Sequence, residues 1–385
     1  MNLLKIGSLN IPRNRWKDAL YVFKNVFCLE KEQEIPDKRF IYIKLKHKGG
    51  LRGYINSKLL GRITNHKDSK IIVNFFIMII RIINMNVLNK IKNLDFDYVH
   101  SSYNDFDESG IFTLICYPYI KGNYITRAYK ETRPEKNYIE KVNFKIANRI
   151  VLNSEENKKY FINKHSDINW NNKRIILGLD EDYRSKDVLK NILYASKLSE
   201  DDGKKHVVIL AGRVMSDESD KRSGGRLCYI DVIKELLHNG FIVHLHCFRV
   251  YNDINNINQY NILANEYKNK FFIEKPLDFE KNSKESYYIL SRYDYGILHN
   301  ISNKNKFVSL FDEINIPHRF YEYENANVIP ILKKGKTILM EKFIIENNCG
   351  IVYNNLNELK NYNTNKIKFF KRSFLEYINV LYKNI

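Results

Sequence analysis

Residues 206–240 read HVVILAGRVMSDESDKRSGGRLCYIDVIKELLHNG, and this stretch decides the fold that we expect. It opens on an unbroken apolar run, His206 to Ala211, which is typical of a buried strand in a parallel sheet. Gly212-Arg213 follows, then a polar, basic loop up to Gly224-Gly225, and an amphipathic helix that begins near Leu227. An open α/β sheet binds anions at such a junction, because free backbone N–H groups and the positive end of the helix dipole face the ligand.

The loop also carries the positive charge that an anion needs. Arg213, Lys221, Arg222 and Arg226 are all available, and the forked guanidinium of arginine suits a diphosphate better than an ammonium does. The alternative is an ordinary turn between a strand and a helix, with solvated charges. The remaining sequence is needed to distinguish an anion site from an ordinary turn.

Strands and helices alternate on both sides of this stretch. Downstream, the pattern predicts strands at 242–247, 271–274, 295–298, 328–331 and 350–352, with helices at 318–324, 340–346 and 374–382. Upstream, it predicts strands at 3–9, 40–45, 97–100, 124–127, 149–152 and 175–177, and helices at 18–29, 54–94 and 137–147. Residues 111–117 fit either a helix or a strand, and Ser154 is a candidate N-cap.

The two runs of alternating elements predict an α/β protein with two doubly wound, Rossmann-like domains facing across a cleft. A charged stretch with only local periodicity separates them, which places a boundary near Asp180. We therefore expect an N-terminal domain over 1–180, a linker over 181–205 and a C-terminal domain over 206–385. The total length suits two domains, each with its own core.

The chain is strongly basic. Its formal net charge is +19, with 44% hydrophobic and 13% aromatic residues, so it is globular rather than disordered. Nucleic acid, an anionic membrane surface and anionic substrates such as sugar nucleotides all fit this charge. Lys and Arg are spread along the chain, with no zinc finger, RNA-recognition signature or basic zipper, so nucleic acid ranks last.

The cysteine pattern points to a reducing compartment. The five cysteines are widely spaced, with no C-x-x-C pair, as in a cytoplasmic protein with buried thiols. The first residues, MNLLKIGSLN, read as a strand rather than a signal peptide. The most apolar stretch, 71–83, is too short to span a bilayer, and it fits either a buried core helix or an interfacial helix that touches lipid.

Five segments, in order along most of the chain, resemble the GT-B glycosyltransferases, and most of all those with the retaining group 1 C-terminal domain. In the first half these are Asp97-Tyr98-Val99-His100, similar to the "D-V-[IV]-H" strand, and 139–154, similar to "E-K … A-D-x-[IV]-I-x-x-S". In the second half they are the strand into Gly212-Arg213, the segment 292–298, and 317–331, which is similar to "P-x-K-x-x-E-Y … P-V-I".

The resemblance implies a role for particular residues. Arg213, with Lys221 or Arg222, neutralises the donor diphosphate and stabilises the departing nucleotide. Glu322 accepts hydrogen bonds from the ribose hydroxyls, and Gly212, Gly224 and Tyr323 complete the donor-binding set. His100 lies at the cleft, near the transferred sugar or the acceptor. The family's earlier glutamate has no clear counterpart, since 311–317 offers only Asp312 and Glu313, and this leaves the stereochemistry open.

No metal site is predicted. Asp95-Phe96-Asp97, Asp105-Phe106-Asp107 and Asp180-Glu181-Asp182 match D-x-D, but none follows a strand in the way that a metal–diphosphate site requires. His244 and His246 alternate on a predicted strand, and nothing completes a set of ligands around them.

The sequence therefore predicts a cytoplasmic glycosyltransferase, with contact to the inner face of the membrane as an option. It moves a sugar from a nucleotide-diphosphate donor, its co-substrate, to a glycan, lipid-linked or protein acceptor, without metal or other cofactor. Arg13, Arg15, Lys44, Lys46, Lys48 and Arg52 are candidates for an anionic acceptor or membrane face. Two alternatives stay open: a non-catalytic polyanion-binding protein on the same scaffold, and a sugar-nucleotide epimerase.

Overall fold

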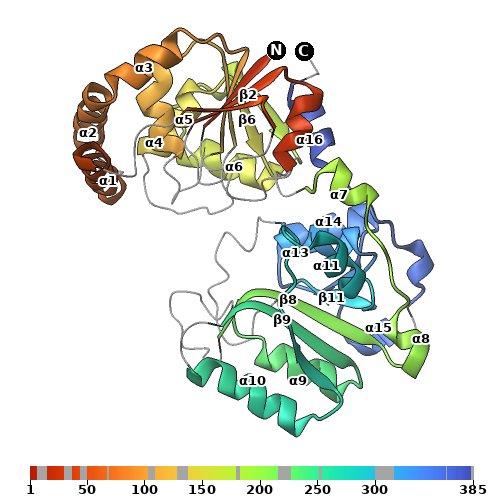
Figure 1. The fold of residues 1–385 in the computed structure, drawn as a ribbon. Coiled ribbons are helices and arrows are strands. Elements are labelled where there is room, and N and C mark those ends of the chain that lie inside the picture. The colour runs from red at the N-terminus through yellow and green to blue at the C-terminus, as the bar shows by residue number, and fades with distance from the viewer. Residues whose placement is uncertain are drawn as a thin grey trace. The chain divides into compact units, whose positions relative to one another are not determined.

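The computed structural model describes residues 1–6, 15–29, 37–43, 50–66, 69–102, 109–127, 138–178, 183–215, 227–250, 254–299, 316–360 and 362–382. The chain forms two compact units (Figure 1). Unit 1 comprises Met1–Ser185 and Ser373–Ile385, and unit 2 comprises Lys186–Arg372. Unit 2 is thus an insertion in unit 1, and the last helix of the chain belongs to unit 1 rather than to the expected domain over 206–385.

Unit 1 is built on a seven-stranded parallel sheet with the order β3-β2-β1-β4-β5-β6-β7. The strands are β1 (Asn2–Ile6), β2 (Asn25–Leu29), β3 (Phe40–Ile43), β4 (Tyr98–Ser102), β5 (Asn123–Arg127), β6 (Arg149–Leu152) and β7 (Arg174–Leu177). The helix predicted over 18–29 is wrong: a 3₁₀ helix, η1 (Arg15–Tyr21), is followed by β2. The β2 sequence NVFCL includes a β-branched valine and an aromatic phenylalanine, both of which favour a strand, and it pairs with β1 and β3.

Helices cover both faces of this sheet. They are α1 (Gly50–Asn65), α2 (Lys70–Ile83), α3 (Met85–Lys92), α4 (Ser109–Cys116), α5 (Tyr138–Ile146), α6 (Glu155–Lys164) and α16 (Phe374–Tyr382), with short 3₁₀ turns η2 (Tyr117–Tyr119) and η3 (Trp170–Asn172). The open choice at 111–117 is therefore settled as helix. Ser154 caps α6 as predicted, since its hydroxyl accepts a hydrogen bond from the backbone N of Asn157 at 3.0 Å.

Alternation along β1 separates the two faces of the sheet. Leu4 and Ile6 point into an apolar core shared with α1, α2, α4 and α5. Lys5 points to the other face, where its ammonium lies 4.8 Å from the ring centre of Trp16 on η1. Helix α16 covers this second face: it lies beside η1 (Figure 1), and the Phe374 ring packs edge-on against Trp16.

Unit 2 contains a six-stranded parallel sheet with the order β10-β9-β8-β11-β12-β13. The strands are β8 (His206–Val214), β9 (Ile242–Val250), β10 (Phe271–Glu274), β11 (Tyr295–Ile297), β12 (Ile329–Lys333) and β13 (Ile351–Tyr353). The helices are α7 (Lys186–Lys190), α8 (Leu198–Asp202), α9 (Ile230–His238), α10 (Ile254–Glu266), α11 (Ser283–Leu290), α13 (His318–Asn325), α14 (Ile338–Asn347) and α15 (Asn357–Lys360), with a 3₁₀ turn η4 (Thr364–Lys366).

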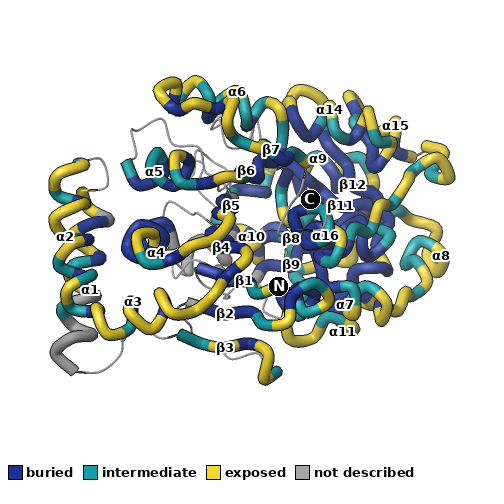
Figure 2. The backbone as a smooth tube through the Cα atoms, turned by 90° about the horizontal axis from the view of Figure 1, so that it is seen from above, coloured by how far each residue is buried: buried dark blue, intermediate teal, exposed yellow. Residues whose placement is uncertain are grey.

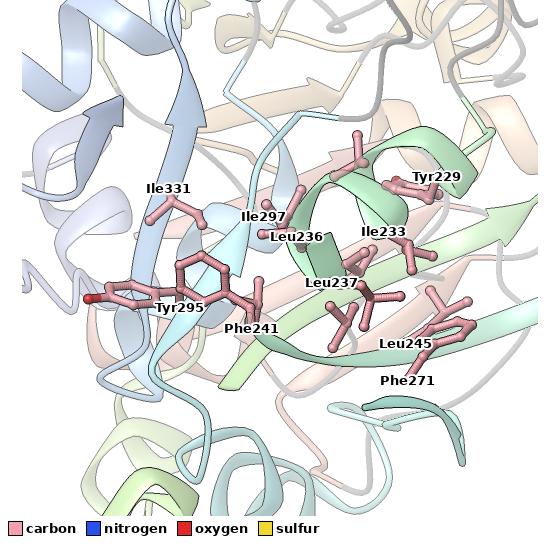
Figure 3. Packing of buried hydrophobic residues seen from close by; sticks show 14 of the residues in the cluster. Tyr229, Ile233, Leu236, Leu237, Phe241, Leu245, Phe271, Tyr295, Ile297 and Ile331 are labelled. Carbon is pink, nitrogen blue, oxygen red and sulfur yellow. The ribbon is translucent and has the colours of Figure 1, made fainter. Parts of the chain in front are cut away.

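The core of unit 2 lies between this sheet and α9. Ile233, Leu236 and Leu237 of α9 are buried with Leu245 of β9 and Ile297 of β11 (Figure 3). The two middle strands are longer than predicted, because β8 continues to Val214 and β9 to Val250, and their extensions pair with each other. Gly212 and Arg213 therefore lie within a strand, not in the loop that we expected.

The expected linker over 181–205 is not free. From residue 186 onward it belongs to unit 2, and Lys197 fastens it there. The Lys197 ammonium donates hydrogen bonds to the carbonyl oxygens of Ser291 (2.8 Å), Tyr293 (2.7 Å) and Asn327 (2.9 Å). Burial lowers the pKa of Lys197 to about 8.

Replacing Lys197 with methionine is expected to destabilise unit 2 by about 2 kcal/mol, because three part-buried carbonyls lose a charged donor. Lys190→Met is the matched control, since Lys190 is exposed on α7 of the same segment. Thermal unfolding followed by far-UV circular dichroism measures the difference. Equal stability of the two variants would show that Lys197 does not fasten the segment.

Among the described residues, no single helix is long and apolar enough to cross a membrane. Helices α2 and α3 reach the required length only as a pair, with a bend of 82° between them.

Candidate functional site

The strand order of unit 2 has a topological switch point between β8 and β11. From β8 the chain proceeds to β9 and β10 on one side of the sheet, and from β11 to β12 and β13 on the other. The connections on the two sides therefore leave the carboxyl ends of β8 and β11 in opposite directions. Ligands of open α/β sheets bind at this point.

The hydroxyl of Tyr323 holds the two strands at this point. Their register pairs are Tyr295↔Val207 and Gly296↔Val208. Beyond them, the Tyr323 hydroxyl accepts a hydrogen bond from the backbone N of Leu210 (3.1 Å) and lies 3.2 Å from the carbonyl oxygen of Ile297. Burial raises the pKa of Tyr323, so the phenol stays neutral. Tyr323, predicted to bind the donor, is fully buried here as a bridge between strands.

Gly296 makes room for that tyrosine. A Cβ atom at position 296 would lie 2.6–2.7 Å from three carbon atoms of the Tyr323 ring. The ring packs directly on the backbone of β11, and only glycine permits this approach.

The carboxyl edge of β11 and β12 carries positive charge. Arg319, in the first turn of α13, donates hydrogen bonds to the carbonyl oxygen of Leu298 (2.5 Å) and to the hydroxyl of Tyr229 (2.9 Å). Lys333 ends β12, and its ammonium lies 2.6 Å from the Glu235 carboxylate. Burial, with a smaller effect of the Lys333 charge, lowers the pKa of Lys336. Among the residues that the structure describes, Arg319, Lys333 and Lys336 thus bring three cations to this edge, where the Glu235 carboxylate pairs with Lys333 and that of Glu341 accepts a hydrogen bond from the backbone N of Gly335.

His299 lies among these cations and is neutral. Burial, reinforced by the charges of Lys336, Arg319 and Lys333, lowers the pKa of His299 to about 3. Its Nδ1 accepts a hydrogen bond from the backbone N of Lys333 at 3.3 Å. The ring proton is then on Nε2, which lies 3.3 Å from the hydroxyl of Tyr353. His299 thus joins β11 to β12 and β13 without adding charge.

Glu322 faces helix α11 rather than open space. It is 5% exposed, and the hydroxyl of Tyr287 donates a short hydrogen bond to its Oε2. The same tyrosine hydroxyl accepts from the Asn325 side chain at 3.3 Å. The predicted ribose ligand is therefore engaged with Tyr287 in this structure.

Of the other predicted donor residues, Gly212 and Arg213 lie near the end of β8. Arg213 lies opposite Arg249 in the β8–β9 register. A Cβ atom built at Gly212 would meet no atom of the described residues within 4 Å. Lys221, Arg222 and Gly224 lie outside the described residues.

His100 has a different environment from the one expected. It lies on β4 of unit 1 with 0% exposure, and its Nδ1 is 2.6 Å from the hydroxyl of Tyr382 on α16. The Trp16 ring packs edge-on against it at 5.4 Å. Helix α16 and η1 thus cover His100, whereas a group beside a transferred sugar has to be exposed to it.

The candidate basic face in unit 1 is not supported at Arg15. Its side chain is 3% exposed, and its guanidinium carbon lies 5.9 Å from the centre of the Phe374 ring. Arg13, Lys44, Lys46 and Lys48 lie outside the described residues. Arg52 lies on α1.

Sequence reasoning missed Arg319 and His299. Arg319 occupies the position of the basic residue in the "P-x-K-x-x-E-Y" pattern, and His299 follows directly on a predicted strand. Both positions lie at the carboxyl edge of a parallel sheet, where such residues meet a ligand. These two signals, read together, point to the basic edge of β11 and β12.

Each unit is thus a doubly wound parallel α/β unit, and in unit 2 basic side chains lie near the β8–β11 switch point. Comparison with known proteins identifies the fold of the whole chain. No family model matches the sequence, and no curated protein matches it significantly.

Solved structures do match. One is trehalose-6-phosphate from E. coli bound with UDP-2-fluoro glucose; it has 10% identity and a TM-score of 0.56, and the match covers 98% of this chain and 95% of that one. The UDP-GlcNAc 2-epimerase from Methanocaldococcus jannaschii matches with 10% identity and a TM-score of 0.51, over 100% of both chains. The N-terminal domain of Candida albicans trehalose-6-phosphate phosphatase matches with 12% identity and a TM-score of 0.57, over 98% and 93%.

The chain therefore has the GT-B glycosyltransferase fold, as the sequence predicted. At this level of identity the similarity shows the fold alone.

Proposed function

We propose that this protein is a glycosyltransferase that binds a nucleotide-diphosphate sugar at the β8–β11 switch point of unit 2. The proposal rests on the elements that carry the basic residues. The strand that bears Arg213 and the edge that bears Arg319 and Lys333 flank one switch point. The E. coli structure of the same fold is bound with UDP-2-fluoro glucose, which is such a donor.

The proposed chemistry is electrostatic. Breaking the bond between sugar and diphosphate leaves negative charge on the departing phosphate, and fixed cations stabilise that charge in the transition state. Arg213, with Lys221 or Arg222, fills this role, and the field of Arg319 adds to it. A bound metal is then not needed. The acceptor is a glycan, a lipid-linked sugar or a protein.

The cysteines support a cytoplasmic site of action. All five are buried and none forms a disulfide, as expected of a protein from a reducing compartment.

Arg213→Ala tests the donor site. We expect kcat/KM for sugar transfer to fall by about 100-fold, and the thermal shift given by the cognate UDP-, GDP- or ADP-sugar in EDTA to disappear. Lys268→Ala is the control, because Lys268 is exposed just before β10, at the amino edge of the same sheet. An unchanged thermal shift in Arg213→Ala would reject the site, and a shift that requires a divalent ion would reject metal independence.

A sugar-nucleotide epimerase is the second candidate, because the M. jannaschii epimerase matches over the full length of both chains. It shares the donor site, so binding does not separate the two activities. Product analysis does: an epimerase converts the donor with no acceptor present, whereas a transferase releases the nucleoside diphosphate only as the sugar moves to an acceptor or water. Salt-sensitive heparin binding that survives Arg213→Ala, without any donor shift, identifies a polyanion-binding protein instead.

A further inference from the structure

Helix α2 of unit 1 is apolar on two opposite sides. Val73, Ile77 and Ile80 are buried in the unit 1 core. The opposite side carries four exposed apolar side chains, which we call the α2 stripe: Ile71 (82% exposed), Phe75 (53%), Met78 (50%) and Ile82 (63%). With about 100° of rotation per residue, these four positions fall within an arc of about 60° on the helix surface. Figure 2 shows buried and exposed residues alternating along α2.

The stripe results from where α2 lies in the unit. Helix α4 packs on β4 and β1, whereas α2 packs on helices α1, α3 and α4 and so forms an outer layer. Arg81 fixes the helix there by donating hydrogen bonds to the carbonyl oxygens of Ile115 (3.1 Å) and Leu114 (2.5 Å) at the end of α4. Asn74 adds a hydrogen bond of 3.2 Å to the hydroxyl of Tyr138 on α5. The stripe is thus presented on a firmly attached helix.

The surroundings of the stripe are strongly basic. Residues 50–93 contain eight Lys and Arg but a single acid, Asp68, a net charge of +7. Of these cations, five are exposed on α1, α2 and α3: Lys58, Arg62, Lys70, Lys90 and Lys92. An apolar stripe in a segment of this positive charge is complementary to an anionic lipid surface, which offers acyl chains beneath negative headgroups.

We propose that the α2 stripe docks this protein on an anionic lipid surface, with α2 lying in the plane of the interface. The length of the helix agrees with this orientation, since 14 residues extend about 21 Å, less than the roughly 30 Å of a hydrocarbon core. A second copy of the chain is a poorer occupant, because a symmetric contact would bring two segments of charge +7 together. The inference goes beyond the proposed function and does not depend on it.

Flotation of the full-length protein with lipid vesicles tests the proposal. The vesicles are pure phosphatidylcholine or an equimolar mixture of phosphatidylcholine and phosphatidylglycerol, each at low and high salt. We expect binding to the mixed vesicles that weakens with salt, and a loss of about tenfold in partitioning for the double variant Phe75→Ser/Met78→Ser. The matched control is Ile338→Ser/Ile345→Ser on α14 of unit 2, where both isoleucines are similarly exposed (68% and 59%).

A fluorescent label reports which surface makes contact. All five native cysteines are buried, so a polarity-sensitive dye attached to Met78→Cys labels one position. Its emission should shift to the blue on the mixed vesicles, whereas the same dye on Ile338→Cys should not respond.

Three results would overturn the proposal. The wild type does not float with phosphatidylglycerol vesicles; or Phe75→Ser/Met78→Ser, folded by circular dichroism, floats as well as the wild type; or the dye at position 78 stays in water. A wild-type dimer that becomes monomeric in the serine variant, with no flotation, would identify a second copy of the chain as the occupant of the stripe.

Discussion

Replacing Gly296 with alanine is expected to destabilise unit 2 by about 3 kcal/mol, near the upper end of the usual cost of overpacking. The new methyl group would lie 2.6 Å from the Tyr323 ring, well inside van der Waals contact. The ring has no easy way to move, because its hydroxyl is hydrogen-bonded to the backbone of β8 and β11. Either the bridge between the two strands breaks, or the strands separate at the switch point.

Gly212→Ala is the matched control for this stability measurement. It makes the same chemical change on the adjacent strand β8, where the added carbon meets no described atom within 4 Å. We expect its free energy of unfolding to stay within about 0.5 kcal/mol of the wild type. Urea unfolding followed by far-UV circular dichroism measures both variants. If Gly296→Ala is as stable as Gly212→Ala, the Tyr323 bridge is not rigid.

Acidification is expected to destabilise unit 2 through His299. Its pKa is about 3 in the folded protein against 6.5 for an ordinary histidine. Between these values the unfolded chain binds the proton and the folded chain does not, so protonation favours unfolding. The stability that the neutral His299 contributes to the folded protein is fully present above pH 6.5. It is lost as the pH falls towards 3, by about 1.4 kcal/mol of unfolding free energy for each pH unit.

His299→Asn isolates this effect, because its side-chain oxygen can still accept the hydrogen bond from Lys333 but does not titrate. We expect the variant to lose less stability than the wild type between pH 6.5 and 4, and His238→Gln, at an exposed position on α9, to behave like the wild type. Both tryptophans, Trp16 and Trp170, belong to unit 1, so their fluorescence does not follow unit 2. The unfolding of unit 2 is instead measured by hydrogen–deuterium exchange of peptides from β11 and β12. Parallel pH profiles for wild type and His299→Asn would contradict the prediction.

The parallel strands were largely predictable because each is a short apolar run followed by turn residues. The predicted strand at 271–274 coincides with β10, and the predicted helix at 374–382 coincides with α16. The ends of β8 and β9 were not predictable, since glycine and arginine at 212–213 normally signal a loop. Pairing between the two extensions outweighs that local preference.

The candidate site was also predictable only in part. The position of His100 on a strand followed from local pattern, but its burial did not, because its partner Tyr382 is 282 residues further along the chain. The engagement of Glu322 with Tyr287 depends likewise on how α11 and α13 pack. Local sequence places a residue on an element, whereas contacts distant in the chain decide whether that residue is open to a ligand.

The return of α16 to unit 1 has a consequence for biosynthesis. The ribosome makes residues 374–382 after the whole of unit 2, so Trp16 and His100 lack the cover of α16 until synthesis has passed Tyr382. Unit 2 is one continuous segment and can complete its core earlier. The part of the chain made first is therefore finished last, and it is the part with an unsatisfied apolar surface for chaperones to protect in the interval.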